Sequence, residues 1–183
     1  MEFFPAFHFG WMNGWLLLGL LVITDVILFL AFRRNTVSRL FDRSGWTKRQ
    51  IALTAIGKLI AMIIILMIIL TPLKLESPVF ILGVSCVIGG LFLLIKALVD
   101  FHHTPPDQPA SQGVYRRSRH PQIIASSLVI LGCTLAIGSW LALILFVVSR
   151  VFLHANLVAE EEICMRKYGD AYRSYMREVP RYF

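Results

Sequence analysis

Five long apolar runs constrain this chain more than any other feature of its sequence. They cover residues 11–32, 51–71, 79–99, 123–137 and 140–158, and only Gly138 and Ser139 separate the last two. About 20 apolar residues form a helix that crosses a hydrocarbon core about 30 Å thick. The 36 residues from 123 to 158 are therefore too many for one crossing and predict a tight helical hairpin. The sequence predicts an all-α integral membrane protein with five transmembrane helices, a C-terminal helical hairpin and an interfacial tail helix from Glu160 onward.

The net charge of +7 would suit a nucleic-acid-binding protein, but the distribution of the basic residues argues against it. They are concentrated in residues 33–49 (which include Arg43), 116–119 and 166–181, whereas the predicted outer segments contain only Lys74. Five crossings place the three basic segments on one side, which the positive-inside rule makes cytoplasmic, with the N-terminus outside. We expect a protein of the inner or cell membrane. Its first run is retained, because the basic start and cleavage site of a signal peptide are missing.

A proline-rich stretch, residues 103–109, divides the chain into two parts. Residues 1–101 form an N-terminal three-helix transmembrane part, and residues 102–183 contain a cytosolic loop, the helical hairpin and the C-terminal tail. Nothing in the composition indicates two independent domains, so we expect one folding unit, and the oligomeric state stays open. No metal site is expected, because Cys86, Cys133 and Cys164 lack the spacing of metal ligands.

Ionisable residues inside membrane helices are costly, so each indicates either pairing or function. Asp25 and Lys58 lie equally far from the basic ends of their runs, and antiparallel neighbouring helices would place them level as an ion pair. Arg150 has no acidic residue within helical reach, while His154 follows one turn later and Glu161 two turns after that. We interpret this stripe as facing the bundle interior, where it contacts a zwitterionic or anionic ligand. The alternative is that Arg150 reaches the lipid interface or caps carbonyl groups of a neighbouring helix.

Residues 113–121, with the sequence GVYRRSRHP, combine basic, aromatic and imidazole side chains directly before an apolar run. Pro121 can open a helix at its first turn without losing a hydrogen bond, and the free N–H groups of such a helix start suit an anion. After the hairpin, residues 160–162 are three glutamates and residues 168–172 read YGDAY. Because the hairpin returns the chain to the same side of the membrane, we expect the basic segment and the carboxylates to meet.

In order and spacing, these segments resemble the C-terminal core of the isoprenylcysteine carboxyl methyltransferase and phospholipid methyltransferase family, over about the last 80 residues. The resemblance implies a membrane enzyme that uses S-adenosylmethionine to methylate a lipid or lipophilic small molecule at the cytoplasmic membrane face. Basic groups suit the cofactor carboxylate, a glutamate suits the ribose diol, and tyrosines suit the adenine ring. The cofactor-binding residues that we expect are Tyr115, Arg119, His120, Pro121, Glu161, Glu162 and Tyr168, and the expected catalytic residues are Arg150, His154 and Asn156.

The chain departs from the family pattern at two positions. Ile123 stands where many members have a tyrosine two residues after the proline, which alters the expected cofactor wall. Asn156 stands where methyltransferases of lipid-modified cysteine often carry an arginine, which argues against carboxyl methylation unless Arg150 takes that role from two turns earlier. The acceptor, and whether it is methylated at oxygen, nitrogen or sulfur, stays open.

Two other interpretations compete with methyl transfer. Membrane sterol reductases share an Arg-His-Pro element and use NADPH, whose extra phosphate would suit Arg116 and Arg117. The short chain and the position of the glutamate triplet favour methyl transfer over this interpretation. The third interpretation is a non-enzymatic membrane partner or a small transporter, but the sequence contains no inverted repeat that would support transport.

Overall fold

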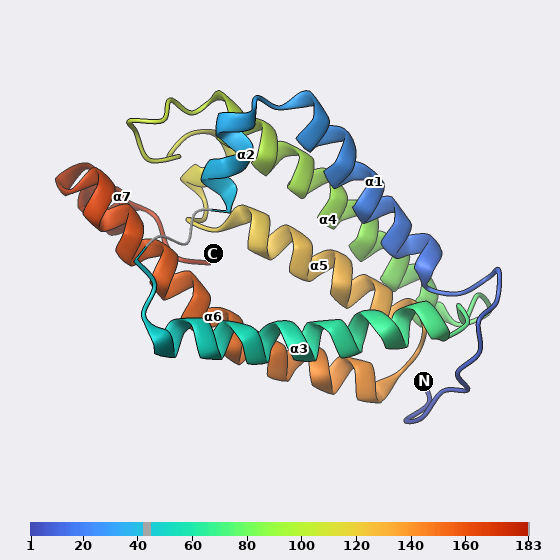
Figure 1. Cartoon of the computed structure of the whole chain (residues 1–183). Coiled ribbons are helices and arrows are strands. Elements are labelled where there is room, and N and C mark those ends of the chain that lie inside the picture. The colour runs from blue at the N-terminus through green and yellow to red at the C-terminus, as the bar shows by residue number, and fades with distance from the viewer. Residues whose placement is uncertain (42–44, 183) are drawn as a thin grey trace.

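The computed structural model describes residues 1–41 and 45–182, so Arg43 of the basic segment lies outside the described residues. Within them the chain is helical (Figure 1), and five helices coincide with the five apolar runs: α1 (Trp15–Ala31), α3 (Lys48–Leu70), α4 (Pro78–His103), α5 (Pro121–Ala136) and α6 (Trp140–Tyr168). By length and composition, α3, α4 and α6 can each cross a membrane, whereas α1 and α5 are shorter apolar helices. The all-helical class is confirmed, and the number of five crossings stays a prediction.

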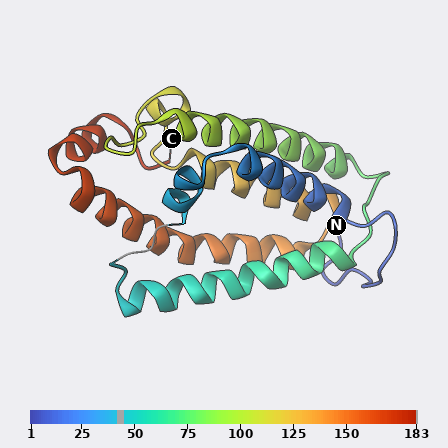
Figure 2. The same cartoon turned by 45° about the horizontal axis from the view of Figure 1, so that its top comes forward.

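The helices are arranged as two long pairs. α5 lies along α4, α6 lies along α3, and α1 contacts the α4–α5 pair (Figures 1 and 2). The pairs are joined by the α5–α6 turn, next to which a common apolar core includes Ile64, Ile68, Val129 and Ile137. Gly138 makes this turn possible, because its φ of +64° is in the left-handed region that favours glycine.

Glycines allow α4 and α5 to approach each other closely. A Cβ atom added at Gly132 would lie 2.8 Å from the backbone nitrogen of Val87, and one added at Gly83 would lie 2.6 Å from the carbonyl oxygen of Gly132. Interfaces of small residues are typical of membrane helices, because association there depends on close van der Waals packing. The α4–α5 pair is therefore held at backbone-to-backbone distance near the end of α5 that leads into the α5–α6 turn.

The structure changes the expected C-terminal region. The glutamates of residues 160–162 belong to α6, which has 29 residues and so extends about 43 Å at 1.5 Å per residue. That exceeds the hydrocarbon thickness of about 30 Å, so the end of α6 projects beyond the membrane-spanning part. The helix ends at Gly169, where φ is +55°, and α7 (Asp170–Glu178) follows. The prediction of a tail helix that begins at Glu160 is therefore wrong by about ten residues.

Two further features differ from the sequence-based expectations. A short helix, α2 (Arg34–Leu40), occupies part of the basic segment. The prediction of an ion pair between Asp25 and Lys58 is wrong. Within residues 1–41 and 45–182, no ion pair joins these two side chains. The reason is the pairing of the helices: Lys58 is on α3, which lies along α6, whereas Asp25 is on α1, which contacts α4.

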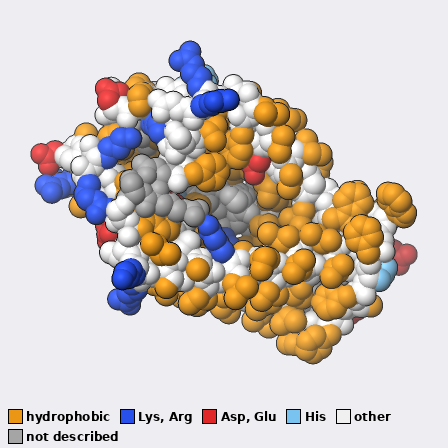
Figure 3. All heavy atoms as spheres, viewed as in Figure 1, with side chains coloured by type: hydrophobic (Ala, Val, Ile, Leu, Met, Phe, Trp, Pro, Cys, Tyr) orange, Lys and Arg blue, Asp and Glu red, His pale blue; other side chains and the backbone are white. Residues whose placement is uncertain are grey.

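The basic side chains gather at one end of the molecule. Lys and Arg side chains cluster at the end where α2 and α7 lie, and hydrophobic side chains cover most of the rest of the visible face (Figure 3). Exposed apolar side chains on α1, α3 and α4 include Leu30, Leu59 and Ile81. An apolar belt with one basic end is the pattern of a membrane protein, and the orientation of that end in the membrane stays a prediction.

Candidate functional site

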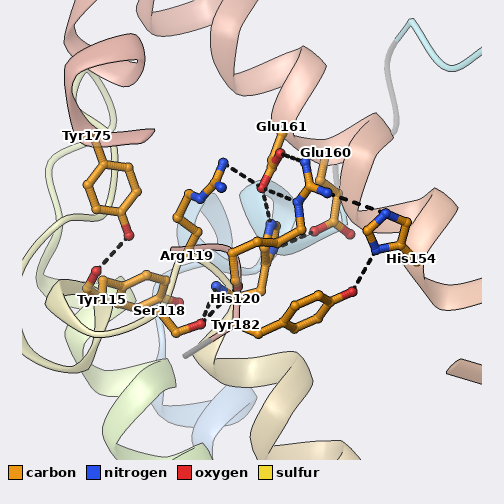
Figure 4. Close-up of polar contacts among 10 residues, drawn as sticks. Tyr115, Ser118, Arg119, His120, His154, Glu160, Glu161, Tyr175 and Tyr182 are labelled. Carbon is orange, nitrogen blue, oxygen red and sulfur yellow. Dashed lines mark hydrogen bonds and ion pairs between the residues drawn. The ribbon is translucent and has the colours of Figure 1, made fainter. Parts of the chain in front are cut away.

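The candidate site lies at the basic end, where the segment before α5 meets the end of α6 and the C-terminal tail (Figure 4). A 3-10 turn, η1 (Gly113–Arg116), leads into this segment, and Pro121 is the first residue of α5. His120 is the N-cap residue, but its side chain makes no capping hydrogen bond. Its backbone N–H donates to Ser118 Oγ at 3.2 Å, and its imidazole lies against α6 instead.

Glu161 is the centre of a buried ion cluster. Its side-chain oxygen Oε1 lies 2.9 Å from Arg119 Nη1 and 3.2 Å from His120 Nε2, and it accepts a hydrogen bond from Arg181 Nε at 3.0 Å. Oε2 accepts a second hydrogen bond from Arg181, from Nη2 at 2.6 Å. Glu161 is only 4% exposed. Three side chains of the protein therefore occupy both oxygens of the Glu161 carboxylate. Glu161 and these three residues, Arg119, His120 and Arg181, are here called the Glu161 cluster.

The surroundings of Glu161 determine its charge state. Burial alone would raise the pKa of its carboxyl, but the hydrogen bonds from His120 and Arg181 and the charge of Arg119 outweigh burial and lower the pKa to about 2. A carboxylate stabilised by positively charged donors stays ionised at neutral pH. The cluster thus contains a permanent negative charge held between two permanent positive charges.

The C-terminal tail is fastened onto the same segment. The backbone N–H of Arg119 donates to the carbonyl oxygen of Pro180 at 3.1 Å, and Ser118 Oγ donates to the carbonyl oxygen of Arg181 at 3.1 Å. Beyond them, the Tyr182 hydroxyl forms a hydrogen bond of 2.8 Å with His154 Nδ1. The tail therefore bridges the start of α5 and the outer part of α6, and it brings Arg181 to Glu161.

A cavity of about 170 Å³ adjoins the Glu161 cluster, and it widens to about 980 Å³ when the region continuous with solvent is counted. Its wall combines three kinds of side chain, namely basic groups, a carboxylate and several tyrosines. The residues that matter most for its chemistry are Arg119, His120, Gln122, Glu160, Lys167, Tyr115, Tyr168, Tyr172 and Tyr175. A concave site with an aromatic wall and a few convergent polar groups is typical of a small-molecule pocket.

Hydrogen bonds hold the tyrosine wall in place. The Tyr175 hydroxyl of α7 donates to the carbonyl oxygen of Tyr115 at 2.7 Å, and Gln122 Nε2 donates to the Tyr115 hydroxyl at 2.8 Å. Burial raises the pKa of both tyrosine hydroxyls above their usual range. The two phenols therefore stay neutral, and the wall offers ring faces to a ligand and no negative charge.

Arg119 retains hydrogen-bonding capacity that the protein does not use. Its Nε and Nη1 atoms are buried and have no hydrogen-bond partner, since Nη1 is close to Glu161 Oε1 but its N–H groups are not directed at that oxygen. Buried donors without acceptors are rare and each one needs an explanation. Arg119 also lines the cavity, so its positive charge lies where an anionic ligand group would bind.

The cofactor-binding residues expected from the sequence are only partly brought together. Tyr115, Arg119, His120 and Tyr168 line the cavity, and Pro121 opens the adjoining helix. Glu161 lies behind the wall, where the other members of its cluster surround it. Glu162 is exposed and accepts a hydrogen bond from Gln50 Nε2 of α3 at 3.0 Å, so its side chain is engaged elsewhere.

Arg150, His154 and Asn156 do not line the cavity. Arg150 donates a hydrogen bond to Ser127 Oγ of α5. Its guanidinium also lies 4.6 Å from the ring centre of Phe146, one turn earlier on α6. The guanidinium also donates to Ser149 Oγ, so two hydroxyl groups and a ring contact it. Asn156 Oδ1 accepts a hydrogen bond from Thr54 Oγ1 of α3 at 3.0 Å, which joins α3 to α6.

Several site residues were not identified from the sequence. Glu160 faces the cavity, and its Oε2 lies 3.7 Å from His120 Nδ1. Tyr172 and Tyr175 of α7 are buried in the aromatic wall, and Arg181 completes the Glu161 cluster. Tyr168, Tyr172 and Tyr175 are spaced at three or four residues, a sequence signal for one face of a helix, whereas nothing in the sequence specifies the partner of Arg181.

A comparison with protein families agrees with the region in which this site is built. The family model described as phospholipid methyltransferase matches residues 78–171, slightly more than half of the chain. That range begins with α4 and includes the segment before α5, the hairpin and all of α6. No curated protein and no solved structure matches the chain.

Proposed function

Since the chain belongs to the phospholipid methyltransferase family, we propose that it transfers a methyl group from S-adenosylmethionine to a lipid or lipophilic small molecule at the basic, cytoplasmic face of the membrane. One observation carries this proposal. Arg119, which lies in the part of the chain that the family covers, has buried N–H donors without hydrogen-bond partners and lines a cavity with a tyrosine wall and a neighbouring carboxylate. This combination suits a ligand that is an amino acid at one end and a nucleoside at the other.

The residues of the cavity fit the parts of this cofactor. Arg119 would hold its carboxylate through charge-assisted hydrogen bonds, and Glu160 would accept hydrogen bonds from its ribose hydroxyls or amino group. The tyrosine wall, chiefly Tyr168 and Tyr172, would cover the adenine ring and the cationic sulfur, since aromatic faces attract cations. When bound, S-adenosylmethionine supplies an electrophilic methyl group.

This assignment changes the role expected for the glutamates. Because both oxygens of Glu161 are occupied by Arg119, His120 and Arg181, we propose that Glu161 is a positioning residue that fixes the two arginines. Glu160 then takes the ligand contact that the sequence suggested for Glu161 or Glu162. The proposal also requires the cavity to open further when the ligand binds, since its volume of about 170 Å³ is below the roughly 300–1,000 Å³ of typical ligand pockets.

The acceptor would approach from the membrane side of the Glu161 cluster. His154 is exposed there. Its Nδ1 atom is hydrogen-bonded to Tyr182, and its Nε2 atom lies 3.4 Å from Arg181 Nη1. Arg150 lies one turn deeper on α6, and we propose that it contacts an anionic group of the acceptor. The protein residues would align the acceptor atom with the methyl group and exclude water from it, which is the contribution that methyl transfer requires.

Equilibrium binding to the detergent-purified protein tests the proposal. S-adenosylmethionine should bind more tightly than NADPH, and Arg119→Gln should weaken it about tenfold to a hundredfold, because a hydrogen bond to a charged group contributes about 1.5–3 kcal/mol and 1.4 kcal/mol is tenfold. Arg116→Gln is the matched control, since Arg116 is exposed and outside the cavity lining. Tighter binding of NADPH would favour a reductase, and unchanged affinity in Arg119→Gln would contradict the assigned cavity.

A further inference from the structure

The N-terminal segment, residues 1–12, exposes an unusual number of aromatic side chains. Phe4 is 73% exposed, Phe9 is 77% exposed and Trp11 is 87% exposed, and Phe3 and Phe7 are also exposed. This segment precedes α1 and contributes none of the residues of the cavity or of the Glu161 cluster. Large exposed aromatic side chains in one short segment indicate a surface that another phase or molecule covers.

The backbone of this segment is fixed at both ends, so the aromatic side chains are held outward. At one end, Glu2 exchanges two hydrogen bonds with the α5–α6 turn: its N–H donates to Gly138 O at 2.7 Å, and its carbonyl oxygen accepts from Trp140 N at 2.9 Å. In the middle of the segment, the N–H of His8 donates to the carbonyl oxygen of Leu70, the last residue of α3, at 2.9 Å, and at the other end the carbonyl oxygen of Met12 accepts from Leu73.

A buried side chain fastens the middle of the segment as well. Asn13 is 1% exposed and donates hydrogen bonds to the carbonyl oxygens of His8 at 2.6 Å and Ile69 at 3.0 Å. Its neighbourhood is closed further by Leu73, whose N–H donates to the carbonyl oxygen of Met12 at 2.9 Å. Backbone groups of Glu2, His8 and Met12 thus bond the rest of the protein, whereas the five aromatic side chains of the segment are exposed.

The segment lies at the end of the bundle opposite the basic end (Figures 1 and 3). Its Glu2 carboxylate pairs with Lys74 Nζ at 2.7 Å, which leaves this part of the segment without net side-chain charge. Trp140, at the start of α6, and Leu75, between α3 and α4, are exposed at the same end. The exposed aromatics therefore continue the apolar surface of the membrane helices up to the point where those helices end.

We propose that residues 1–12 form an interfacial anchor, whose partner is the boundary between lipid headgroups and acyl chains in the leaflet opposite the candidate site. Trp and aromatic rings concentrate at this boundary because an apolar ring body and a polar or quadrupolar edge suit its mixed environment. The anchor ties the α5–α6 turn and the end of α3 to one membrane surface. It thereby fixes the depth of the two helix pairs, and it does not depend on the methyl-transfer proposal.

Fluorescence quenching in lipid vesicles tests the anchor with the intact protein. Phosphatidylcholine vesicles carry bromine either near the headgroup end or near the terminal end of the acyl chains, and the signal of Trp11 is obtained as the difference between the wild type and Trp11→Phe. We expect at least twofold stronger quenching of this difference signal by the shallow bromines than by the deep ones. Trp11→Phe is conservative at an exposed position, so it should not disturb folding.

Trp15→Phe is the matched control, because Trp15 is only partly exposed and donates from Nε1 to the carbonyl oxygen of Gly10 at 3.0 Å. Its difference signal should respond less to the shallow bromines. A Trp11 emission typical of water, without quenching by either lipid, would overturn the proposal. A blue-shifted Trp11 emission that neither lipid quenches would also overturn it, since that result would mean that a second copy of the chain covers the aromatics.

Discussion

Replacing Glu161 with glutamine should destabilise the protein strongly, although the side chains have nearly the same shape. The change removes the only negative charge of the Glu161 cluster and leaves Arg119 and Arg181 facing each other across a neutral amide. Leaving buried charges without their partner costs about 3–5 kcal/mol. The pKa of Glu161 gives a similar value independently, since lowering it from its ordinary 4.5 to about 2 corresponds to about 3 kcal/mol of folding free energy at 1.36 kcal/mol per pH unit.

The same pKa predicts how this difference depends on pH. Because the pKa of Glu161 is lower in the folded than in the unfolded state, its contribution is complete above about pH 4.5 and is lost as the pH falls through about 2. The stability gap between wild type and Glu161→Gln should therefore be about 3 kcal/mol at pH 7. It should narrow as the pH falls below about 4.5 and close below about pH 2, where the wild-type carboxyl is also neutral.

The gap can be measured as the free energy of unfolding in mixed micelles with increasing denaturing detergent, followed by far-ultraviolet circular dichroism at several pH values. Glu162→Gln is the matched control, since Glu162 is exposed and accepts a hydrogen bond from the neutral Gln50 side chain. It should change stability by no more than about 0.5 kcal/mol. The reasoning is refuted if Glu161→Gln is as stable as Glu162→Gln at pH 7, or if their difference does not change with pH.

Two other substitutions test the acceptor side and the packing of the helices. Arg150→Met should reduce methyl transfer at least tenfold, or about 1.4 kcal/mol of transition-state stabilisation, with little change in stability. Ser127→Ala removes the contact of Arg150 with α5 but keeps the arginine, so it should retain activity. Full activity of Arg150→Met would make the arginine a structural residue. Gly132→Ala should destabilise by about 1–3 kcal/mol, because the added methyl group overpacks against Val87 of α4. Gly89→Ala is the control: its added Cβ would lie 3.9 Å from its nearest neighbour, so it should be neutral or slightly stabilising in the same unfolding measurement. Equal effects of the two substitutions would contradict the close α4–α5 contact.

The helices were predictable because hydrophobicity alone reports where a chain can cross a membrane. The apolar runs give the five helices with ends within about four residues, except that α6 continues ten residues beyond the run that ends at residue 158, and the break at Gly138 marks the hairpin. Hydrophobicity does not report which helix packs against which. For that reason the predicted pairing of Asp25 with Lys58 failed, since it assumed that α1 and α3 are neighbours along their length.

The candidate site was predictable in its location but not in its detail. The hairpin had to return the glutamates to the basic segment, and His120 does meet Glu161. Which glutamate faces the cavity is set by the phase of α6, since successive residues point about 100° apart on a helix of 3.6 residues per turn. Three consecutive glutamates alone do not indicate which of them points toward the cavity. The contact of Arg181 with Glu161 depends on the path of the tail after α7, which composition does not determine.

The Glu161 cluster explains how a buried carboxylate can serve an anionic ligand that it does not touch. Arg119 and Arg181 carry two positive charges and Glu161 carries one negative charge, so these three residues together carry one net positive charge. At an effective dielectric constant of about 20, two unit charges 4 Å apart attract by about 4 kcal/mol. Without Glu161, the two guanidinium groups would repel each other and Arg119 would lose its fixed place at the cavity wall. The carboxylate thus holds the arginines together, and the uncompensated positive charge attracts an anionic group to Arg119.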